Sequence, residues 1–256
     1  MKPNVWAIPG IFMFYGSSLE AKSHKHNAIQ IVWPSACSTV TILDTQVVTP
    51  LIIASDITHK LEMQAGWVIL VEPQSWLGVL LSAYLQNDPY RQITNLARFT
   101  SANQSVMVEF AAVATILTPL LLSLNITWQQ SDEQYNINGN KLDDRINSLL
   151  HRLNGCFGKE CLKPNRWRAN AVASELAISE SRFLHLFRQE MGIAWRPYLL
   201  WRRLLCAVQA IEYGKNATES AYLAGFSDSA HLSRTFHNTF GMTLRDAKLS
   251  LNQMDS

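Results

Sequence analysis

The stretch GFSDSAHLSRTFHNTFG, residues 225–241, gives one short predicted helix two different faces. An apolar stripe, of the kind that packs against a protein core, recurs every fourth residue at Leu232, Phe236 and Phe240. Polar side chains recur at the same interval on another side of the helix: Ser229, Ser233 and His237, with Arg234 beside them. The polar face is the one whose purpose has to be explained.

The same pattern occurs once more, earlier in the chain. The stretch AVASELAISESRFLHLFRQEMG, residues 171–192, aligns with residues 219–241, and equivalent positions lie 48 or 49 residues apart. Each copy predicts a helix, a tight turn and a second helix, and the second helices have N-cap candidates at Ser179 and Asp228. Residues 195–213 predict a long amphipathic helix that joins the two copies.

A helix-turn-helix motif has requirements that both copies meet. It needs a small residue near the turn, an apolar stripe behind the second helix, and short polar or basic side chains in front, where that helix enters the major groove. Gly225 lies in the second turn, and Arg234 on the front face can bond O6 and N7 of guanine together. The front face of each second helix is therefore predicted to read DNA.

The stretch AYLAGFSDSAHLSRTFHNTFGMT, residues 221–243, closely resembles the C-terminal signature of the AraC/XylS family of bacterial transcription regulators. The first copy and the helix YLLWRRLLCAVQAI, residues 198–211, follow that family's order and spacing. The resemblance implies two recognition helices in successive major grooves. It implies base-facing positions at Ser181, Leu184, His185, Ser229, Ala230, Ser233 and Arg234. It implies phosphate contacts at Arg188 and His237.

The N-terminal half has a different pattern. Short segments rich in Ile, Val, Thr and Trp between residues 28 and 72 predict strands, and the pattern turns helical over 88–124. We therefore expect a two-domain α+β protein: a cupin-like β-barrel with a helical dimerisation element, followed by an all-α domain with two helix-turn-helix motifs joined by a long helix. The expected boundaries are an effector and dimerisation domain at 1–127, a polar linker at 128–140 and the DNA-binding domain at 141–256.

Four polar residues of the β-rich region form a candidate effector site: His24, His26, Gln30 and His59. A metal cupin has two histidines of this spacing, then a glutamate, then a distant histidine. Gln30 stands at the carboxylate position, and a neutral amide is a poor ligand for a divalent metal. We interpret these residues as groups that orient a small effector, with no metal and no cofactor.

Residues 106–124, VMVEFAAVATILTPLLLSL, form an apolar helix with heptad-like spacing. Such a seam fits a helix packed against a partner or against its own domain, better than a membrane span. The assigned dimerisation residues are Phe110, Val113, Leu117, Leu120 and Leu124.

Composition and charge favour a globular protein with one basic half. Residues 1–140 hold 6 Lys and Arg against 9 Asp and Glu, whereas residues 141–256 hold 16 against 11. The positive half is the one expected to meet DNA. The four cysteines lack zinc-finger spacing, the N-terminus lacks a cleavage-site pattern, and we expect reduced thiols in a cytoplasmic protein.

The sequence therefore predicts a DNA-binding transcription regulator, not an enzyme. Its expected partners are double-stranded DNA, a small-molecule effector, a second copy in a homodimer and, for an activator, RNA polymerase, with no membrane. Two alternatives stay open: an architectural DNA binder with little sequence preference, and a metal-cupin enzyme fused to a DNA-binding domain. The modest balance of +5 over residues 141–256 disfavours the first, because architectural binders are usually far more basic.

Overall fold

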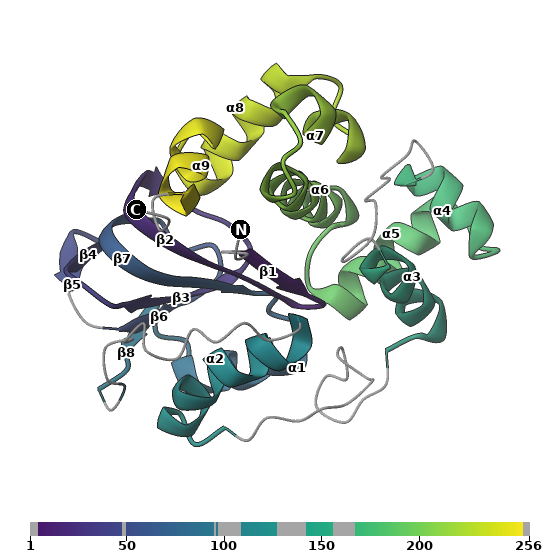
Figure 1. Ribbon diagram of the computed structural model, residues 1–256. Helices are drawn as coiled ribbons and strands as arrows, with labels where there is room; N and C mark the ends of the chain where they lie inside the picture. Colours follow the sequence, from purple (N-terminus) through teal and green to yellow (C-terminus); the bar gives the residue numbers. More distant parts are fainter. Residues whose placement is uncertain are drawn as a thin grey trace. The chain divides into compact units, whose positions relative to one another are not determined.

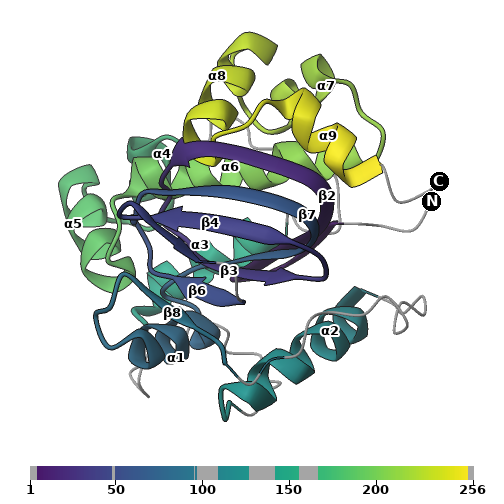
Figure 2. The same ribbon diagram turned by 90° about the vertical axis from the view of Figure 1, so that its left-hand side faces the viewer.

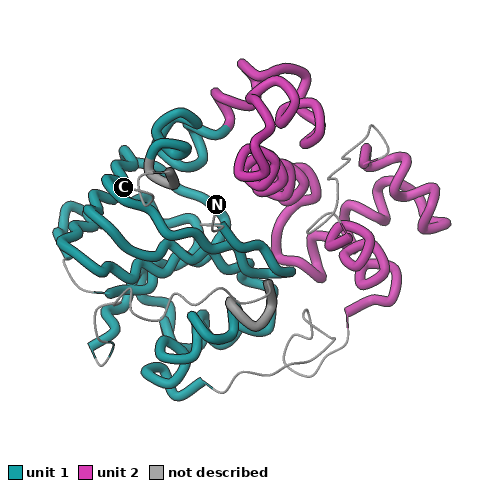
Figure 3. The backbone as a smooth tube through the Cα atoms, viewed as in Figure 1, with its two compact units in different colours: residues 1–134, 236–256 teal, residues 135–235 magenta. Residues whose placement is uncertain are grey.

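A computed structural model describes residues 5–47, 50–94, 96, 109–126, 142–155 and 167–252. The chain forms two compact units (Figure 3). The first comprises residues 1–134 together with 236–256, and the second comprises residues 135–235. The expected linker at 128–140 lies outside the described residues.

The first unit is built on one antiparallel sheet of eight strands (Figure 1). The strands are β1 (Val5–Ile8), β2 (Ile11–His24), β3 (Ile29–Pro34), β4 (Ser38–Ile42), β5 (Thr45–Val47), β6 (Leu51–Ile53), β7 (His59–Val71) and β8 (Tyr90–Gln92). The main path runs β1-β2-β7-β3-β6-β8, and β4 pairs with both β5 and β7. Strand β7 is thus central, with β2 along one edge and β4 and β3 in turn along the other.

Two helices cover one face of this sheet (Figure 2). Helix α1 (Trp76–Leu85) begins at the N-cap Ser75, whose hydroxyl accepts from the main-chain N–H of Gly78. Helix α2 (Glu109–Ser123) places its apolar seam in the same core as Ile69 of β7. Each fully buried aliphatic side chain contributes about 1.5–3 kcal/mol, so the seam fastens α2 to its own unit.

The structure corrects the sequence-based assignment at the edges of this unit. Strands β1 and β2 were not predicted, although β2 is the longest strand of those described. The region expected to be helical from residue 88 holds the short strand β8, and α1 begins before it. Among the helices in the described part of the chain, none combines the length and apolarity needed to cross a bilayer.

The second unit is helical. Its helices are α3 (Asp144–Asn154), α4 (Ala169–Glu175), α5 (Glu180–Met191), α6 (Trp195–Glu212), α7 (Ala217–Leu223) and the first part of α8 (Ser229–Phe240). Its core joins α3, α4, α5 and the start of α6, where the ring of Trp195 meets those of Phe183 and Phe187 edge-on at 5.2 and 5.0 Å. The last turn of α8 and helix α9 (Leu244–Asn252) are grouped with the first unit, where α9 contacts β2.

A buried arginine links two helices in the core of the second unit. Arg202 of α6 is fully buried and donates to the carbonyl oxygen of Leu153 at 3.1 Å and to Oδ1 of Asn154 at 2.9 Å. Both acceptors belong to the last turn of α3. A positive charge at a helix C-terminus also interacts favourably with the helix dipole, so Arg202 anchors α3 to α6. Sequence analysis did not single out this residue.

Candidate functional site

The first helix-turn-helix motif consists of α4, a turn and α5. The hydroxyl of Ser179 accepts from the main-chain N–H of Arg182 at 3.2 Å, which confirms Ser179 as the N-cap of α5. The turn itself passes through Ala177, whose φ of 54° lies in the left-handed region that favours glycine. This backbone geometry turns the chain sharply enough to bring α5 across α4.

The second motif, α7, a turn and α8, repeats that geometry. Gly225 has a φ of 80° at the position equivalent to Ala177. Oδ1 of Asp228 accepts from the main-chain N–H of His231 at 2.7 Å, which confirms the predicted cap of α8. This bond, with one from Ser227, lowers the pKa of the Asp228 carboxyl, so it stays ionised at the helix N-terminus.

Both second helices bury one face and expose the other, as predicted. The buried faces carry Phe183, Leu186 and Phe187 in α5 and Leu232, Phe236 and Phe240 in α8. The predicted DNA-contacting side chains that are exposed are Ser181, Leu184, His185, Arg188, Ala230, Ser233, Arg234 and His237. Ser229 is half-buried at the start of α8. The exposed sets combine hydroxyls, imidazoles and guanidinium groups, which suit base edges and phosphates.

Leu184 differs from the other exposed candidates for DNA contact because its side chain is large and apolar. It is one of the few large apolar side chains that the described residues expose, at 37%. A leucine held outward on a helix whose neighbours are polar gains nothing from water. Its role as a base-facing residue against the methyl group of thymine stays a prediction.

The four predicted effector residues lie together inside the first unit. His24, His26, Gln30 and His59 are all buried. His24 and His59 are paired across β2 and β7, and their ring centroids lie 4.3 Å apart. His26 lies 5.6 Å from His24 and 5.4 Å from His59 by the same measure, and its Nε2 is 2.9 Å from the Gln30 amide.

The three imidazoles are held in their neutral form. Burial is the largest cause, and the positive charge of a neighbouring histidine adds to it. Together these effects lower the pKa of His24, His26 and His59 to about 4 in each case. At neutral pH each ring therefore offers a lone pair on one nitrogen, which is the state that accepts a hydrogen bond or binds a metal.

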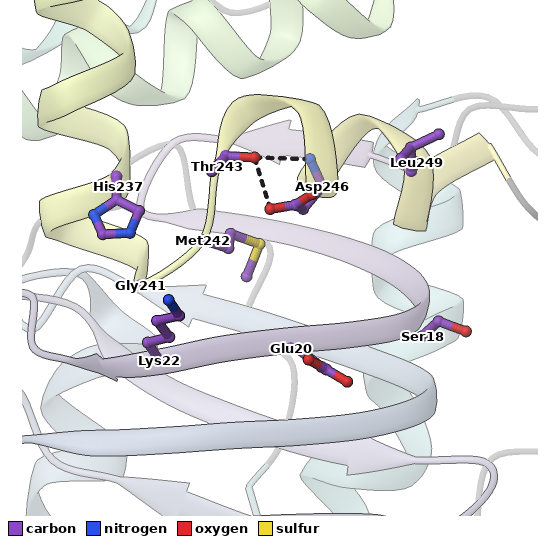
Figure 4. A pocket seen from close by; sticks show the side chains of 9 residues that line it. All are labelled: Ser18, Glu20, Lys22, His237, Gly241, Met242, Thr243, Asp246 and Leu249. Carbon is purple, nitrogen blue, oxygen red and sulfur yellow. Dashed lines mark hydrogen bonds between the residues drawn. The ribbon is translucent and has the colours of Figure 1, made fainter.

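A pocket of about 390 Å³ lies within the first unit, between β2 and the segment that follows α8 (Figure 4). Glu20 and Lys22 of β2 lie on one side, and His237 and Asp246 lie on the other. Thr243 caps α9 by accepting from the main-chain N–H of Asp246 at 3.1 Å. His237, a predicted phosphate contact, is thus also part of this pocket, which sequence analysis did not anticipate.

The assigned dimerisation residues require a correction. Val113, Leu117 and Leu120 are fully buried in the core of the first unit, and Leu124 is nearly so. These side chains are not available to a second copy, so the seam packs against its own domain. The side chain of Phe110 lies outside those described.

The cysteines also differ in part from expectation. Cys37 is free and exposed, whereas Cys206 of α6 is disulfide-bonded. The expectation that all thiols are reduced is therefore wrong for Cys206.

Comparisons with known proteins identify the two motifs. Residues 172–248 match a family model described as a helix-turn-helix domain. Over 130 residues the chain is 30% identical to the HTH-type transcriptional activator RhaS of Shigella boydii and 29% identical to RhaS of Escherichia coli. These alignments cover 50% of this chain and 44% of each relative, so the match spans less than half of the relatives' length.

A solved structure shares the arrangement of elements over nearly the whole chain. A crystal structure of an apo ToxT variant from Vibrio cholerae superimposes with a TM-score of 0.52 at 11% identity, covering 96% of this chain and 100% of that one. At this identity the likeness shows the fold alone, a β-sheet domain followed by a helical domain. The family model and the RhaS relatives confirm the resemblance found in the sequence: residues 172–248 form a helix-turn-helix domain, and this part of the chain is similar to the RhaS activators.

Proposed function

We propose that the chain is a sequence-specific DNA-binding transcription regulator that inserts α5 and α8 into adjacent major grooves. One observation carries this proposal. Both second helices bury an aromatic face and expose short polar and basic side chains, with Arg188 on one and Arg234 on the other. A solvated helix needs neither the repeated turn geometry nor the paired faces.

The length of helix α6 supports the proposal that one protomer binds two major grooves. It has 18 residues, which at about 1.5 Å per residue gives a length of about 27 Å. Successive major grooves on one face of DNA lie about 34 Å apart. A spacer of this length, with a motif attached at each end, suits recognition of two half-sites by one protomer.

Regulation by an effector in the first unit belongs to the same proposal. The buried polar group of His24, His26, His59 and Gln30 is the candidate effector site, because a few convergent polar side chains orient ligands in pockets. A homodimer and a contact with RNA polymerase are further parts of the proposal, and neither uses the buried seam of α2.

Selection of binding sites from a random DNA library by the purified chain tests the proposed function. We expect an enriched sequence with two conserved blocks about one helical turn, or 10–10.5 base pairs, apart. A library that binds without enrichment would favour the architectural alternative, in which phosphate contacts dominate. A single conserved block would contradict the use of both motifs.

A further inference from the structure

The three buried histidines come from positions far apart in the chain but share one end of the sheet. His24 ends β2, His26 follows it in the next turn, and His59 begins β7 opposite His24. One ring nitrogen from each residue lies within 4.8 Å of those from the other two. Residual exposure of the three side chains is between 2% and 8%.

The main chain engages one nitrogen of each ring. Nδ1 of His24 lies 2.7 Å from the carbonyl oxygen of Lys22, Nδ1 of His26 lies 3.1 Å from that of Ala28, and Nδ1 of His59 lies 2.9 Å from that of Ile57. A carbonyl oxygen can only accept, so Nδ1 of His24 and Nδ1 of His59 carry the hydrogen and donate, and these neutral rings have their lone pair on Nε2. Nε2 of His26 faces Oε1 of Gln30, so its lone pair becomes available when that amide turns away.

The same arrangement is what orients histidines that bind metals. A metal-binding imidazole usually donates its other N–H to a main-chain carbonyl or a carboxylate, which sets the tautomer and the ring orientation. Here all three rings are anchored in this way.

One of the three nitrogens lacks a partner. Within the part of the chain that the structure describes, Nε2 of His59 is buried and accepts no hydrogen bond. A buried polar atom left without a partner costs about 1–3 kcal/mol. A ligand that accepts the lone pair at this place would remove that cost.

We propose that His24, His26 and His59 bind a divalent transition-metal ion through their three Nε2 atoms. Three imidazoles with an open fourth position form a complete zinc site, and imidazole also suits iron, nickel and copper. Bonds of about 2.0–2.1 Å in a tetrahedral site imply nitrogen separations of about 3.3 Å. The three ring nitrogens now lie within 4.8 Å of one another, so binding requires them to approach by up to about 1.5 Å.

Gln30 defines the character of this site. Its Oε1 lies 2.9 Å from Nε2 of His26 and brings no negative charge, so the amide has to turn away when that nitrogen binds the ion. The sequence-based prediction was that the site holds no metal, because this neutral amide occupies the place of a carboxylate ligand. The three imidazoles supply enough ligands without it, and the bound ion keeps its full charge of +2. Such a site favours a hydroxide or another small anion at the fourth position.

The site adjoins the end of the second recognition helix. His24 donates to the carbonyl of Lys22, and the main-chain N–H of Lys22 donates to the carbonyl oxygen of Gly241 at 2.9 Å. The ring centroids of His26 and Phe240 lie 6.2 Å apart. An ion that draws the rings together therefore shifts groups that touch the end of α8. The ion then acts as the effector, a role that rests on the proposed function.

Isothermal titration calorimetry of the metal-stripped full-length chain with Zn²⁺ measures the stoichiometry and affinity of metal binding, and so tests the site without DNA. We expect uptake of about one ion per chain, and Co²⁺ should give the visible absorption of a tetrahedral site. His59→Gln should reduce the affinity at least 100-fold. His151→Ala, which removes an exposed histidine of α3, should leave it unchanged. Circular dichroism of each variant verifies folding. Absence of uptake by the wild-type chain, or uptake that survives His59→Gln, overturns the site.

Affinity for the selected DNA sequence, measured with and without Zn²⁺, tests the effector role. We expect a change of at least fivefold for the wild-type chain and none for His59→Gln. An unchanged affinity in a chain that binds zinc overturns the effector role. Loss of sequence-specific DNA binding under all metal conditions contradicts the proposed function instead, so the two failures can be told apart.

Discussion

The main-chain N–H of Lys22 donates to the carbonyl oxygen of Gly241 across 2.9 Å, and so joins strand β2 to the residue that ends helix α8. Gly241 has a φ of 68°, and the approach is close enough that a Cβ atom there would lie 2.2 Å from the carbonyl oxygen of Lys22. Only glycine allows this contact. The strand that carries His24 is therefore bonded directly to the end of a predicted recognition helix.

Gly241→Ala should destabilise the first unit. The new methyl group meets backbone atoms of β2, which cannot move aside as a flexible side chain could, and alanine is also strained at a positive φ. We expect a loss of at least about 2 kcal/mol in the free energy of unfolding, measured by urea denaturation.

Gly214→Ala is the matched control for this change. Gly214 has a φ of 84°, and a Cβ there meets no atom within 4 Å, as judged from the described residues. An alanine at this position has the strain of a positive φ but no steric clash, so the free energy of unfolding should fall by about 1 kcal/mol. Equal losses for the two variants would show that the contact with Lys22 contributes nothing.

Ala177→Gly should stabilise the second unit. Ala177 has a φ of 54° in the turn where the second motif has Gly225, and it is exposed, so no packing is lost. Relief of left-handed strain, about 1–2 kcal/mol, exceeds the added entropy of the unfolded chain, about 0.4–1 kcal/mol. We expect a gain of about 0.5–1 kcal/mol in urea denaturation.

The opposite sign is expected for Ala171→Gly in the neighbouring helix α4. Ala171 has a helical backbone, so glycine there should cost about 1 kcal/mol. A loss of stability in Ala177→Gly would mean that the turn is not strained.

Arg202→Met should destabilise the second unit by about 2 kcal/mol. The methionine fills much of the same volume, but the carbonyl of Leu153 and the amide of Asn154 lose a charged donor inside the core. Arg196→Met, at an exposed position near the start of the same helix, should change stability by less than about 0.5 kcal/mol. Thermal unfolding followed by circular dichroism compares the two, and equal effects would contradict an anchoring role for Arg202.

The two helix-turn-helix motifs could be predicted because their signals are local. Helical periodicity assigned Leu232 to the core and Ser233 to the surface, and the caps at Ser179 and Asp228 depend on bonds within one turn. The period of the α2 seam likewise predicted a buried face. The period could not predict what buries that face, because a helix that packs against a partner and a helix that packs against its own sheet have the same apolar spacing.

Features that depend on distant pairing were missed. Strand β2 starts with the unbroken apolar run IFMFY, which lacks the alternation of a half-buried strand, and its pairing with β7 gives it strand structure. The spacing of His24, His26 and His59 marked them as a group, yet their carbonyl anchors come from the backbone alone. The contact between Lys22 and Gly241 leaves no trace in either local sequence.

Arg188→Ala should weaken binding to all DNA sequences by a similar factor. As a predicted phosphate contact it carries no base information, so the ratio of selected to scrambled affinity should stay constant. The slope of log affinity against log salt concentration should fall by about 1. Fluorescence anisotropy over a salt series measures both quantities, and a changed ratio would reassign Arg188 to base reading.

Arg234→Ala should have the complementary effect. The guanidinium is exposed on the front face of α8, where two parallel hydrogen bonds to O6 and N7 of guanine distinguish one base pair by about 1–3 kcal/mol. Repeating the random-library selection with this variant should relax the preference at one position of one block and leave the other block intact. Arg188→Ala serves as the matched control, because it removes the same charge from α5 without relaxing any position. If Arg234→Ala selects the wild-type sequence with an unchanged preference at every position, Arg234 does not read a base, and the front face of α8 must specify its site through the hydroxyl of Ser233 or through DNA shape.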